Sequence, residues 1–371
     1  MLVVGEASGD LHGAQLVKAL SEQDPGLRFF GVAGEQLKQT RFEILFSVSQ
    51  LAGMGLVELA GSVGNIWKAY AVLRRALRER RPNLLVLIDF PEFNLRLAKL
   101  AKELKIPVLY YISPQIWAWR RGRVRQIARW VDHMAVVFPF EVSFYEKRGV
   151  HVTFVGHPLL DIVRCRESRE AILTQLGLDR ARQTVGILPG SRRGELVHHL
   201  PVLLDAAVRL RREMEIQFVV IRASTIERRE IETMLERVPF NVPIVEDKRY
   251  DAVNACDLAW TASGTVTVET ALLLKPMIIV YRLSWLTYAL ARMLVKVKHI
   301  GMVNIVAGDA VVPELVQADF TVERVVSESR KLLNNPDLRN KLIKKLAALR
   351  EKLGVPGAAR RVADIAASMM A

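Results

Sequence analysis

Two loops in the second half of the sequence have the residue types that bind a diphosphate. The first, residues 188–192 (LPGSR), follows an apolar run and precedes the helical pattern of residues 195–212. Gly190 would let the backbone approach an oxyanion, Ser191 can donate a hydrogen bond, and Arg192 offers a forked cationic donor. The loop therefore predicts a phosphate site; a plain strand-to-helix turn with a solvated arginine is the alternative.

The second loop, residues 261–269 (TASGTVTVE), also follows an apolar run and leads into an apolar helix. Ser263, Gly264 and Thr265 stand at the start of that helix, where exposed N–H groups and the helix dipole attract anions. Glu269 comes four residues after Thr265, one turn up the same face, where a carboxylate can accept both hydroxyls of a ribose. The two loops together predict a nucleoside-diphosphate site; an N-cap followed by an exposed glutamate is the alternative for the second.

Carboxylates at the ends of predicted strands in the N-terminal half are candidates for acid–base chemistry. Asp89 comes directly after the apolar run 84–88, and Glu92 follows in a less favourable position. We predict that Asp89 is a general base. The alternative is that Asp89 caps the helix that follows.

Residues 4–10 (VGEASGD) form a glycine-rich loop between the first strand and a helix predicted to begin near Leu11. The loop lacks both GxGxxG and the Walker lysine, so it is neither a standard dinucleotide site nor a P-loop. Its candidates for substrate binding are Glu6, Ser8, Gly9 and Asp10.

Residues 113–120 (SPQIWAWR) follow another predicted strand and place two tryptophans beside polar groups. Tryptophans in such a loop suit stacking on sugar faces, and they suit core packing equally well. The arginines that follow more often mark a solvated face than a site, although they suit anionic lipid head groups. The candidates for substrate binding in this loop are Ser113, Gln115, Trp117 and Arg120.

An apolar stretch at residues 51–73 continues as a helical stripe and is followed by five arginines between positions 74 and 81. An apolar surface bordered by arginines is typical of an interfacial membrane helix, and a helix that faces the protein core gives the same pattern. A second stretch, residues 285–294, has the same ambiguity. The candidates for membrane contact are Leu56, Leu59, Val63, Ile66 and Trp67.

The composition restricts the partners and ligands. A net charge of +14 favours phosphorylated substrates or anionic lipid, and no zinc finger or RNA-binding signature accompanies it, so we expect no nucleic-acid partner. The two cysteines, Cys165 and Cys256, lie far apart, which excludes a disulfide framework and a cysteine zinc site. No DxD motif and no HxH or HxxxH pair occurs. We therefore expect neither a metal nor a cofactor.

Short apolar runs alternate with helical patterns and predict the strands of parallel sheets covered on both faces. They lie at residues 84–88, 108–112, 134–138, 152–155, 184–188, 217–221, 257–260 and 276–281. Two successive arrays predict two doubly wound α/β domains with ligand loops at the carboxyl ends of the strands. We assign residues 1–157 to the first domain and 158–340 to the second. Residues 341–371 should be helices that pack back on the N-terminal domain.

Targeting and membrane-spanning segments are not evident. No uncharged apolar run approaches the roughly 20 residues that span a bilayer, and no secretory signal is visible at the start. We expect a soluble or peripheral protein on the reducing side of the membrane.

Eight ordered motifs resemble those of the lipid-A-disaccharide synthases and cover most of the chain. They are GEASGD (5–10), GMG (53–55), IDFPEFN (88–94), YISPQIWAW (111–119), VGHP (155–158), LPGSR (188–192), ASGT (262–265) with Glu269, and VN (303–304). Each motif alone is modest, whereas the ordered set is highly specific.

The resemblance implies a GT-B glycosyltransferase with two Rossmann-like domains and no cofactor. It further implies an inverting transfer of 2,3-diacylglucosamine from its UDP derivative to 2,3-diacylglucosamine 1-phosphate, which gives the β-1,6-linked disaccharide 1-phosphate and UDP. By motif match, Arg192, Glu269 and Asn304 would contact UDP, and Asp89 would be the base. The resemblance also implies a peripheral position on the inner face of the inner membrane, and it allows a homodimer with exchanged C-terminal segments.

Two other kinds of function stay open on the residues alone. A UDP-sugar epimerase, or a GT-B transferase with another acceptor such as a polyprenyl-linked one, would share the donor loops. A non-catalytic basic protein would bind nucleic acid or membrane with a steep salt dependence and would release no UDP.

Overall fold

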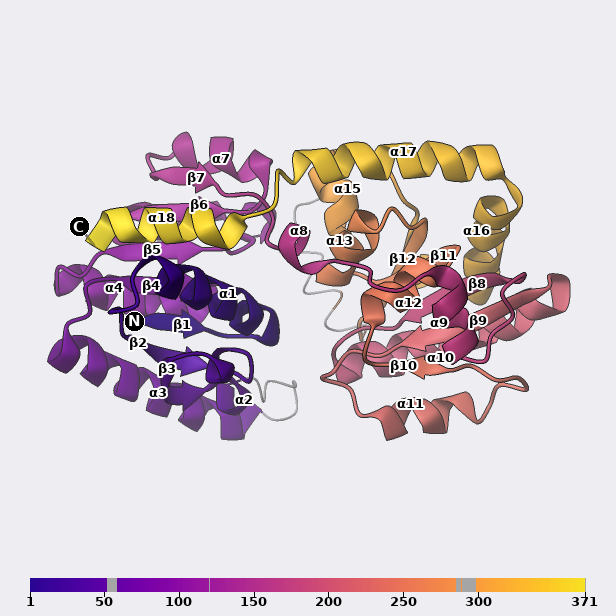
Figure 1. Cartoon of the computed structure of the whole chain (residues 1–371), viewed down its shortest axis with the longest axis horizontal. Helices are drawn as coiled ribbons and strands as arrows, with labels where there is room; N and C mark the ends of the chain where they lie inside the picture. The colour runs from indigo at the N-terminus through magenta and orange to yellow at the C-terminus, as the bar shows by residue number, and fades with distance from the viewer. Residues whose placement is uncertain (52–58, 120, 285–287, 289–297, 371) are drawn as a thin grey trace. The chain divides into compact units, whose positions relative to one another are not determined.

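The computed structural model of the chain describes residues 1–51, 59–119, 121–284, 288 and 298–370. The chain divides into two compact units (Figure 1). The first unit consists of Met1–Leu160 together with Leu353–Ala371, and the second of Asp161–Lys352. Each unit is built around one parallel sheet.

The sheet of the first unit has seven strands in the order β3-β2-β1-β4-β5-β6-β7. The strands are β1 (Leu2–Val4), β2 (Phe29–Ala33), β3 (Phe42–Ser47), β4 (Leu85–Ile88), β5 (Val108–Tyr111), β6 (His133–Val136) and β7 (Val152–Phe154). Every residue of β1, β4, β5 and β6 is buried, as continuous apolar runs require when helices cover both faces.

Two sets of helices cover this sheet. Helix α1 (Ala7–Gln23) packs with α18 (Ala358–Met370), while α3 (Leu59–Arg80), α4 (Pro91–Glu103) and α6 (Val124–Trp130) pack with one another (Figure 1). The remaining short helices are α2 (Val48–Leu51), η1 (Leu37–Gln39), α5 (Ile116–Trp119), η2 (Arg121–Arg123), α7 (Pro139–Glu146) and α8 (Leu159–Ile162). From β1 the chain adds strands β2 and β3 toward one edge of the sheet, and from β4 it adds β5, β6 and β7 toward the other edge. Because all these crossover connections are right-handed, the helices of the two halves lie on opposite faces of the sheet.

The sheet of the second unit has six strands in the order β10-β9-β8-β11-β12-β13. They are β8 (Gln183–Leu188), β9 (Ile216–Ile221), β10 (Ile244–Val245), β11 (Leu258–Ala262), β12 (Met277–Tyr281) and β13 (Glu314–Val316). The helices are α9 (Arg169–Gln175), α10 (Arg193–Glu213), α11 (Arg228–Leu235), α12 (Arg249–Ala255), α13 (Thr265–Leu272), α15 (Met302–Ala307), η3 (Gln317–Asp319), α16 (Val322–Asn334) and α17 (Pro336–Lys352).

The predicted α/β class and the predicted strands are confirmed, with ends shifted by one or two residues. The first helix was placed wrongly: α1 begins at Ala7, not near Leu11. Glu6 is extended, and the N–H of Asp10 already donates to the Glu6 carbonyl at 3.0 Å, so Ser8, Gly9 and Asp10 lie in the first turn.

The boundaries of the units differ from the predicted domain limits. They fall after Leu160 and after Lys352 instead of after residues 157 and 340. Helix α17 stays with the second unit because its buried Leu342, Leu346 and Leu349 belong to a helix that packs against α13, α15 and α16. Of the predicted C-terminal segment, residues 341–371, only the part from Leu353 onward, which contains α18, belongs to the first unit.

Helix α18 is bound to the first unit by packing and by polar contacts. Val362, Ala363 and Ala366 are buried on a helix that packs against α1, where Gln23 Nε2 donates to Asp364 Oδ1 at 2.7 Å. Arg361 donates through Nε to the Val155 carbonyl at 2.8 Å, which joins the helix to the end of β7.

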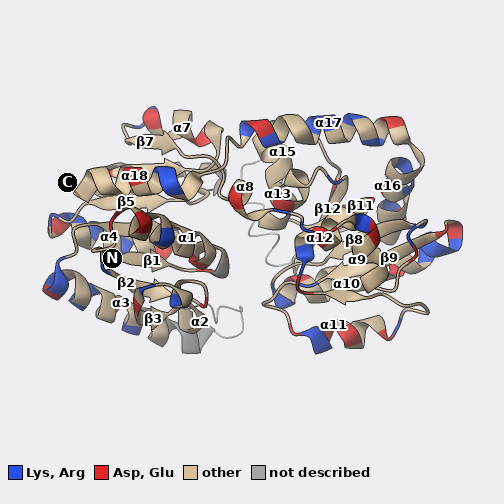
Figure 2. Ribbon diagram, viewed as in Figure 1, with Lys and Arg blue, Asp and Glu red and all other residues tan. Residues whose placement is uncertain are grey.

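Charged residues of both signs are interleaved along the helices of each unit (Figure 2). Within the described ranges, no helix combines the length and the apolar character that crossing a membrane requires.

Candidate active site

Each sheet contains a point where the strand order reverses, and the loops at the carboxyl ends of the strands there form the usual ligand site of such folds. In the first unit the reversal lies between β1 and β4, and in the second between β8 and β11. The loop of Glu6 and the loop of Asp89 therefore meet in the first unit. In the second unit, residues 189–192 and residues 263–265 follow the neighbouring strands β8 and β11.

Asp89 lies directly after β4 in an unusual backbone conformation. Its φ is 49°, and φ of Phe90 is also 49°, a left-handed conformation that non-glycine residues seldom adopt. The carbonyl of Asp89 accepts hydrogen bonds from Asn94 Nδ2 at 2.7 Å and from the Tyr110 hydroxyl. Each such residue costs about 1–3 kcal/mol, and strain of this kind is concentrated at functional sites.

The N-cap residue of α4 is Phe90, whose side chain makes no capping hydrogen bond. The Phe90 ring lies against Gly5, where an added Cβ would lie 2.3 Å from the Cβ and Cγ of Phe90. Only glycine lets the loop after β1 approach the Asp89 turn this closely, and the exposed side chains of Glu6 and Ser8 follow directly.

Asp10, predicted to bind substrate, is buried and holds the backbone of another loop. Its carboxylate accepts hydrogen bonds from the N–H groups of Gly34 and Gln36 at 2.7 Å each and from Leu37 at 3.3 Å. Gly9, the neighbouring candidate, is buried against Ile88 and Val4. Both candidates are therefore buried, and Asp10 holds the backbone of residues 34–37 in place.

A buried polar cluster follows β5 and β6, and its central residue was not predicted from the sequence. Glu141 in α7 accepts hydrogen bonds from Trp117 Nε1 at 3.1 Å and from the Phe138 N–H at 3.2 Å. Ser113 Oγ bonds the Tyr145 hydroxyl at 2.7 Å. Burial raises the pKa of Glu141 to about 7, and hydrogen bonds from Ser113 and its other neighbours oppose the shift. Ser113 and Trp117 are thus buried, whereas Gln115 is exposed.

Several candidates fall outside the described part of the chain. Leu56 and Arg120 lie there, as do residues 53–55 and most of the second apolar stretch, and the side chains of Leu59 and Val63 are not described. On the rest of α3, Ile66 is half-buried, and Trp67 is 60% exposed.

In the second unit the loop after β8 is shaped by Glu195. Gly190 has φ of 128°, and a Cβ there would lie 2.4 Å from Glu195 Oε2. The same oxygen accepts from the Ser191 N–H at 2.9 Å. Arg192 Nη1 lies 3.7 Å from Glu195 Oε1, and the Arg192 side chain is 67% exposed. The arginine can therefore reach a ligand.

The loop after β11 leads into α13, with Gly264 at the N-cap. The helix leaves its first N–H groups without intrahelical acceptors. Glu269, one turn later, is mostly buried; its Oε1 accepts from Arg249 Nη2 at 2.8 Å and from the Tyr250 hydroxyl at 3.1 Å. Burial raises the pKa of Glu269, and the nearby Arg249 opposes this shift. The α12 partners of this carboxylate were not predicted from the sequence.

Two predicted UDP contacts use their polar atoms within the protein. Ser263 Oγ donates to the Ile300 carbonyl at 2.9 Å. Asn304 is fully buried; its Nδ2 donates to the Val312 carbonyl and to Glu314 Oε1, and its Oδ1 accepts from the backbone of residues 311 and 312. Both residues therefore hold the segment beside α13 in place.

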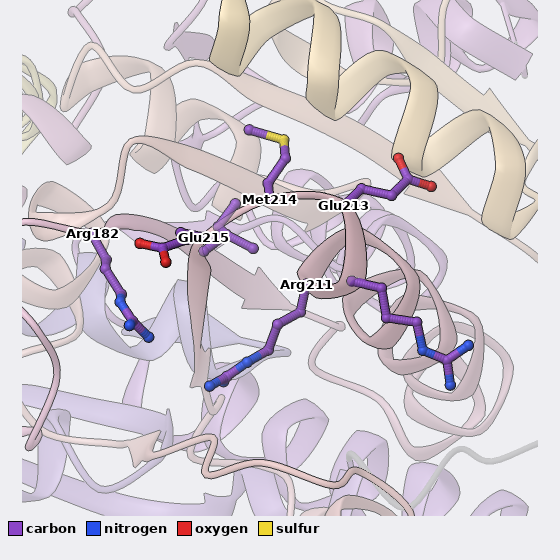
Figure 3. Close-up of a pocket in the computed structure, with 7 residues that line it drawn as sticks. Arg182, Arg211, Glu213, Met214 and Glu215 are labelled. Atoms are coloured by element: carbon purple, nitrogen blue, oxygen red, sulfur yellow. The ribbon is translucent and has the colours of Figure 1, made fainter.

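Two hollows lie away from residues 189–192 and 263–265. One of about 290 Å³ lies where β8 and β9 begin, at the opposite edge of the sheet from the phosphate-type loops. In Figure 3, Arg182 and Arg211 extend in the same direction there, and Glu213 points away. The other, about 390 Å³, lies in the first unit beside α4. Among the described residues, no group of three or more His, Cys, Asp or Glu side chains could hold a metal ion.

Comparison with known proteins identifies close relatives over the full length. A family model described as lipid-A-disaccharide synthetase matches residues 1–365. The lipid-A-disaccharide synthase of Geobacter metallireducens is 49% identical over 371 residues, which are 100% of this chain and 97% of that protein. The synthase of Geobacter sulfurreducens is 47% identical with the same coverage.

Solved structures with a similar fold are distant in sequence. A UDP-GlcNAc 2-epimerase from Neisseria meningitidis bound to UDP-GlcNAc has a TM-score of 0.63 at 12% identity, covering 100% of this chain and 98% of that chain. The glycotransferase of kitacinnamycin has a TM-score of 0.65 at 16% identity with the same coverage. These similarities show the two-domain GT-B fold.

Proposed function

Because the chain belongs to the lipid-A-disaccharide synthase family, we propose that it makes the β-1,6-linked lipid A disaccharide 1-phosphate. The reaction transfers 2,3-diacylglucosamine from its UDP derivative to 2,3-diacylglucosamine 1-phosphate and releases UDP. The observation that carries this proposal is the 49% identity along the whole chain. The placement of the predicted loops at the reversal point of each sheet supports it.

The second unit would bind the donor. The exposed Arg192 and the backbone at Gly190 would contact the diphosphate, and the first N–H groups of α13 would face it from the neighbouring strand. Glu269 would accept the ribose hydroxyls, and its ion pair with Arg249 favours the ionised carboxylate. Ser263 and Asn304 would act by holding the wall of the pocket, because their polar atoms are engaged within the protein.

The first unit would bind the acceptor and supply the base. Asp89 would take the proton from the 6-hydroxyl as that oxygen attacks the anomeric carbon of the donor. The bond from that carbon to the diphosphate breaks at the same time, and the configuration inverts. Arg192 and the start of α13 would stabilise the charge that develops on the departing UDP. Glu6, Ser8 and Gln115 are proposed to contact the acceptor, since their side chains are exposed.

Membrane contact and assembly are further parts of the proposal. Trp67, with 60% of its surface exposed on a helix rich in arginine, would insert among lipids on the inner face of the inner membrane. We also propose a homodimer in which the C-terminal segments, including α18, are exchanged between two chains. Light scattering in solution would measure the mass, and vesicle sedimentation would measure lipid binding.

Mass spectrometry of the product tests the function directly. The protein is incubated with both acylated sugars, and a disaccharide monophosphate with one equivalent of UDP is expected. Asp89→Asn should lower kcat by about 10²–10⁴, whereas Asp205→Asn, at an exposed ion pair of α10, should not. Near-wild-type turnover by the Asp89 variant would show that another group is the base. Epimerised UDP-N-acetylglucosamine in a reaction with that compound alone would indicate an epimerase instead.

A further inference from the structure

The pocket of about 390 Å³ beside α4 has the chemistry of a site for a phosphorylated amphiphile, and no role has been assigned to it. Its walls carry the cationic side chains of Arg96, Lys99 and Arg123 and the apolar surfaces of Tyr70, Leu95 and Trp130. We propose that it binds the phosphate of the acylated acceptor sugar. This inference rests on the proposed function and adds a recognition site to it.

Part of the positive charge on the cationic wall is not neutralised by a carboxylate of the described residues. Glu92, Arg96 and Lys99 follow one another at i, i+4 and i+7 on the exposed face of α4. Among the described residues, Arg96 has no acidic partner, and Lys99 lies 4.0 Å from Glu103. Three cations and one carboxylate leave the pocket with a net positive charge, which favours a phosphate.

Arg123 faces α4 from the end of η2. Its Nη2 lies 2.5 Å from both carboxylate oxygens of Glu92, and its side chain is 18% exposed. Nη1 is buried and has no acceptor within the described residues. Because Arg123 neutralises Glu92, the one acidic group of the pocket does not oppose binding of an anion by Arg96 and Lys99.

The apolar wall distinguishes a lipid from a soluble anion. Tyr70 packs edge-on against Trp67 at 6.4 Å and against Phe93 at 6.3 Å, and Phe93 stacks on Phe90 at 5.5 Å. This aromatic row runs from the exposed Trp67 past the pocket to the residue next to Asp89. Inorganic phosphate would use only the cations, whereas an acylated sugar phosphate would use both walls.

The position of the pocket favours the acceptor over a lipid of the bilayer. Pro91 and Glu92, which line it, come two and three residues after Asp89. Arg96 is one helical turn, about 6 Å, beyond Glu92. A molecule bound here with its phosphate at Arg96 has its sugar beside the proposed base, as the acceptor requires and a bilayer phospholipid does not.

The experiment compares the acceptor with and without its 1-phosphate, both by equilibrium binding and by kcat/KM. The wild type should prefer the phosphorylated acceptor, and Arg96→Ala should reduce this preference by about ten- to a hundredfold, the effect of losing a charged hydrogen bond. Lys99→Ala should act in the same direction more weakly, and the KM for the UDP donor should stay unchanged. Arg148→Ala removes an exposed arginine two residues beyond the end of α7 and should retain the full preference.

An Arg96 variant that discriminates between the two acceptors as the wild type does would overturn the proposal. If that variant also loses sedimentation with phosphatidylglycerol vesicles, the pocket is assigned to the bilayer instead. A wild type that forms no disaccharide would refute the proposed function instead, and the binding measurements would still decide what the pocket recognises.

Discussion

Replacement of Glu141 by glutamine should make the stability of the first unit less dependent on pH. Burial holds the pKa of Glu141 at about 7 in the folded protein, against 4.5 for an ordinary glutamate. As the pH rises from 4.5 to 7, the unfolded chain loses this proton while the folded protein retains it, so the free energy of unfolding decreases. Below this range and above it, Glu141 adds no pH dependence.

The size of the effect follows from the shift. A rise of the pKa from 4.5 to about 7 corresponds to about 3 kcal/mol, most of it between pH 4.5 and 7. The glutamine side chain has nearly the same shape and can still accept from Trp117, but it does not ionise. Relative to the wild type, Glu141→Gln should therefore gain about 3 kcal/mol as the pH rises, which is a change of roughly 1 M or more in the urea midpoint.

Urea unfolding at several pH values between 5 and 8, followed by tryptophan emission, measures this difference. Glu146→Gln is the matched control, because it changes an exposed glutamate at the end of the same helix. A difference between Glu141→Gln and wild type that stays constant from pH 5 to pH 8 would refute the reasoning. It would mean that Glu141 is ionised throughout and that the cluster around Ser113 is hydrated.

Three further changes test the loops of the site. Arg192→Ala should raise the KM for the UDP donor by about ten- to a hundredfold, whereas Arg193→Ala, at a side chain that is 79% exposed, should leave this KM unchanged. Steady-state kinetics compares the two variants, and equal effects on the KM would contradict a specific contact of Arg192 with the donor. Gly5→Ala should destabilise the fold by about 1–3 kcal/mol and lower kcat, because the added Cβ displaces the Phe90 ring. Unchanged thermal unfolding and turnover would contradict the close approach of Gly5 to Phe90. Asp10→Ala should cost about 3 kcal/mol or more in unfolding experiments because three N–H groups lose their acceptor, and a loss below 1 kcal/mol would show that water replaces it.

The sequence predicted those parts of the site that depend on local order along the chain. Asp89 and the loop of Arg192 come directly after buried apolar runs, and in a parallel sheet this alone places them at the ligand edge. Strands β3 and β10, each at one edge of its sheet, were not predicted, because β3 is half exposed and β10 has only two residues, so neither forms a continuous apolar run.

The partners of the predicted residues could not be found in this way. Glu141 meets Trp117 because the paired strands β5 and β6 bring the short helices that follow them together. Arg249 meets Glu269 because α12 and α13 precede and follow the same strand, β11. Composition also does not tell whether a polar side chain faces a ligand or its own backbone. Asn304 occurs in a motif that implies contact with UDP, yet its amide is fully used by the loop that follows α15.

The first unit is made of two segments separated by the whole of the second, and this determines when it can be completed during synthesis. The ribosome produces residues 1–160 first, but α18, which covers α1, emerges about 200 residues later. At about 5–20 residues per second, roughly 10–40 s pass in between. Throughout this interval the face of α1 that α18 will cover is exposed to water. The nascent chain therefore presents a helix-sized apolar surface that chaperones can bind. This surface becomes buried only when α18 has been synthesised and packs against α1.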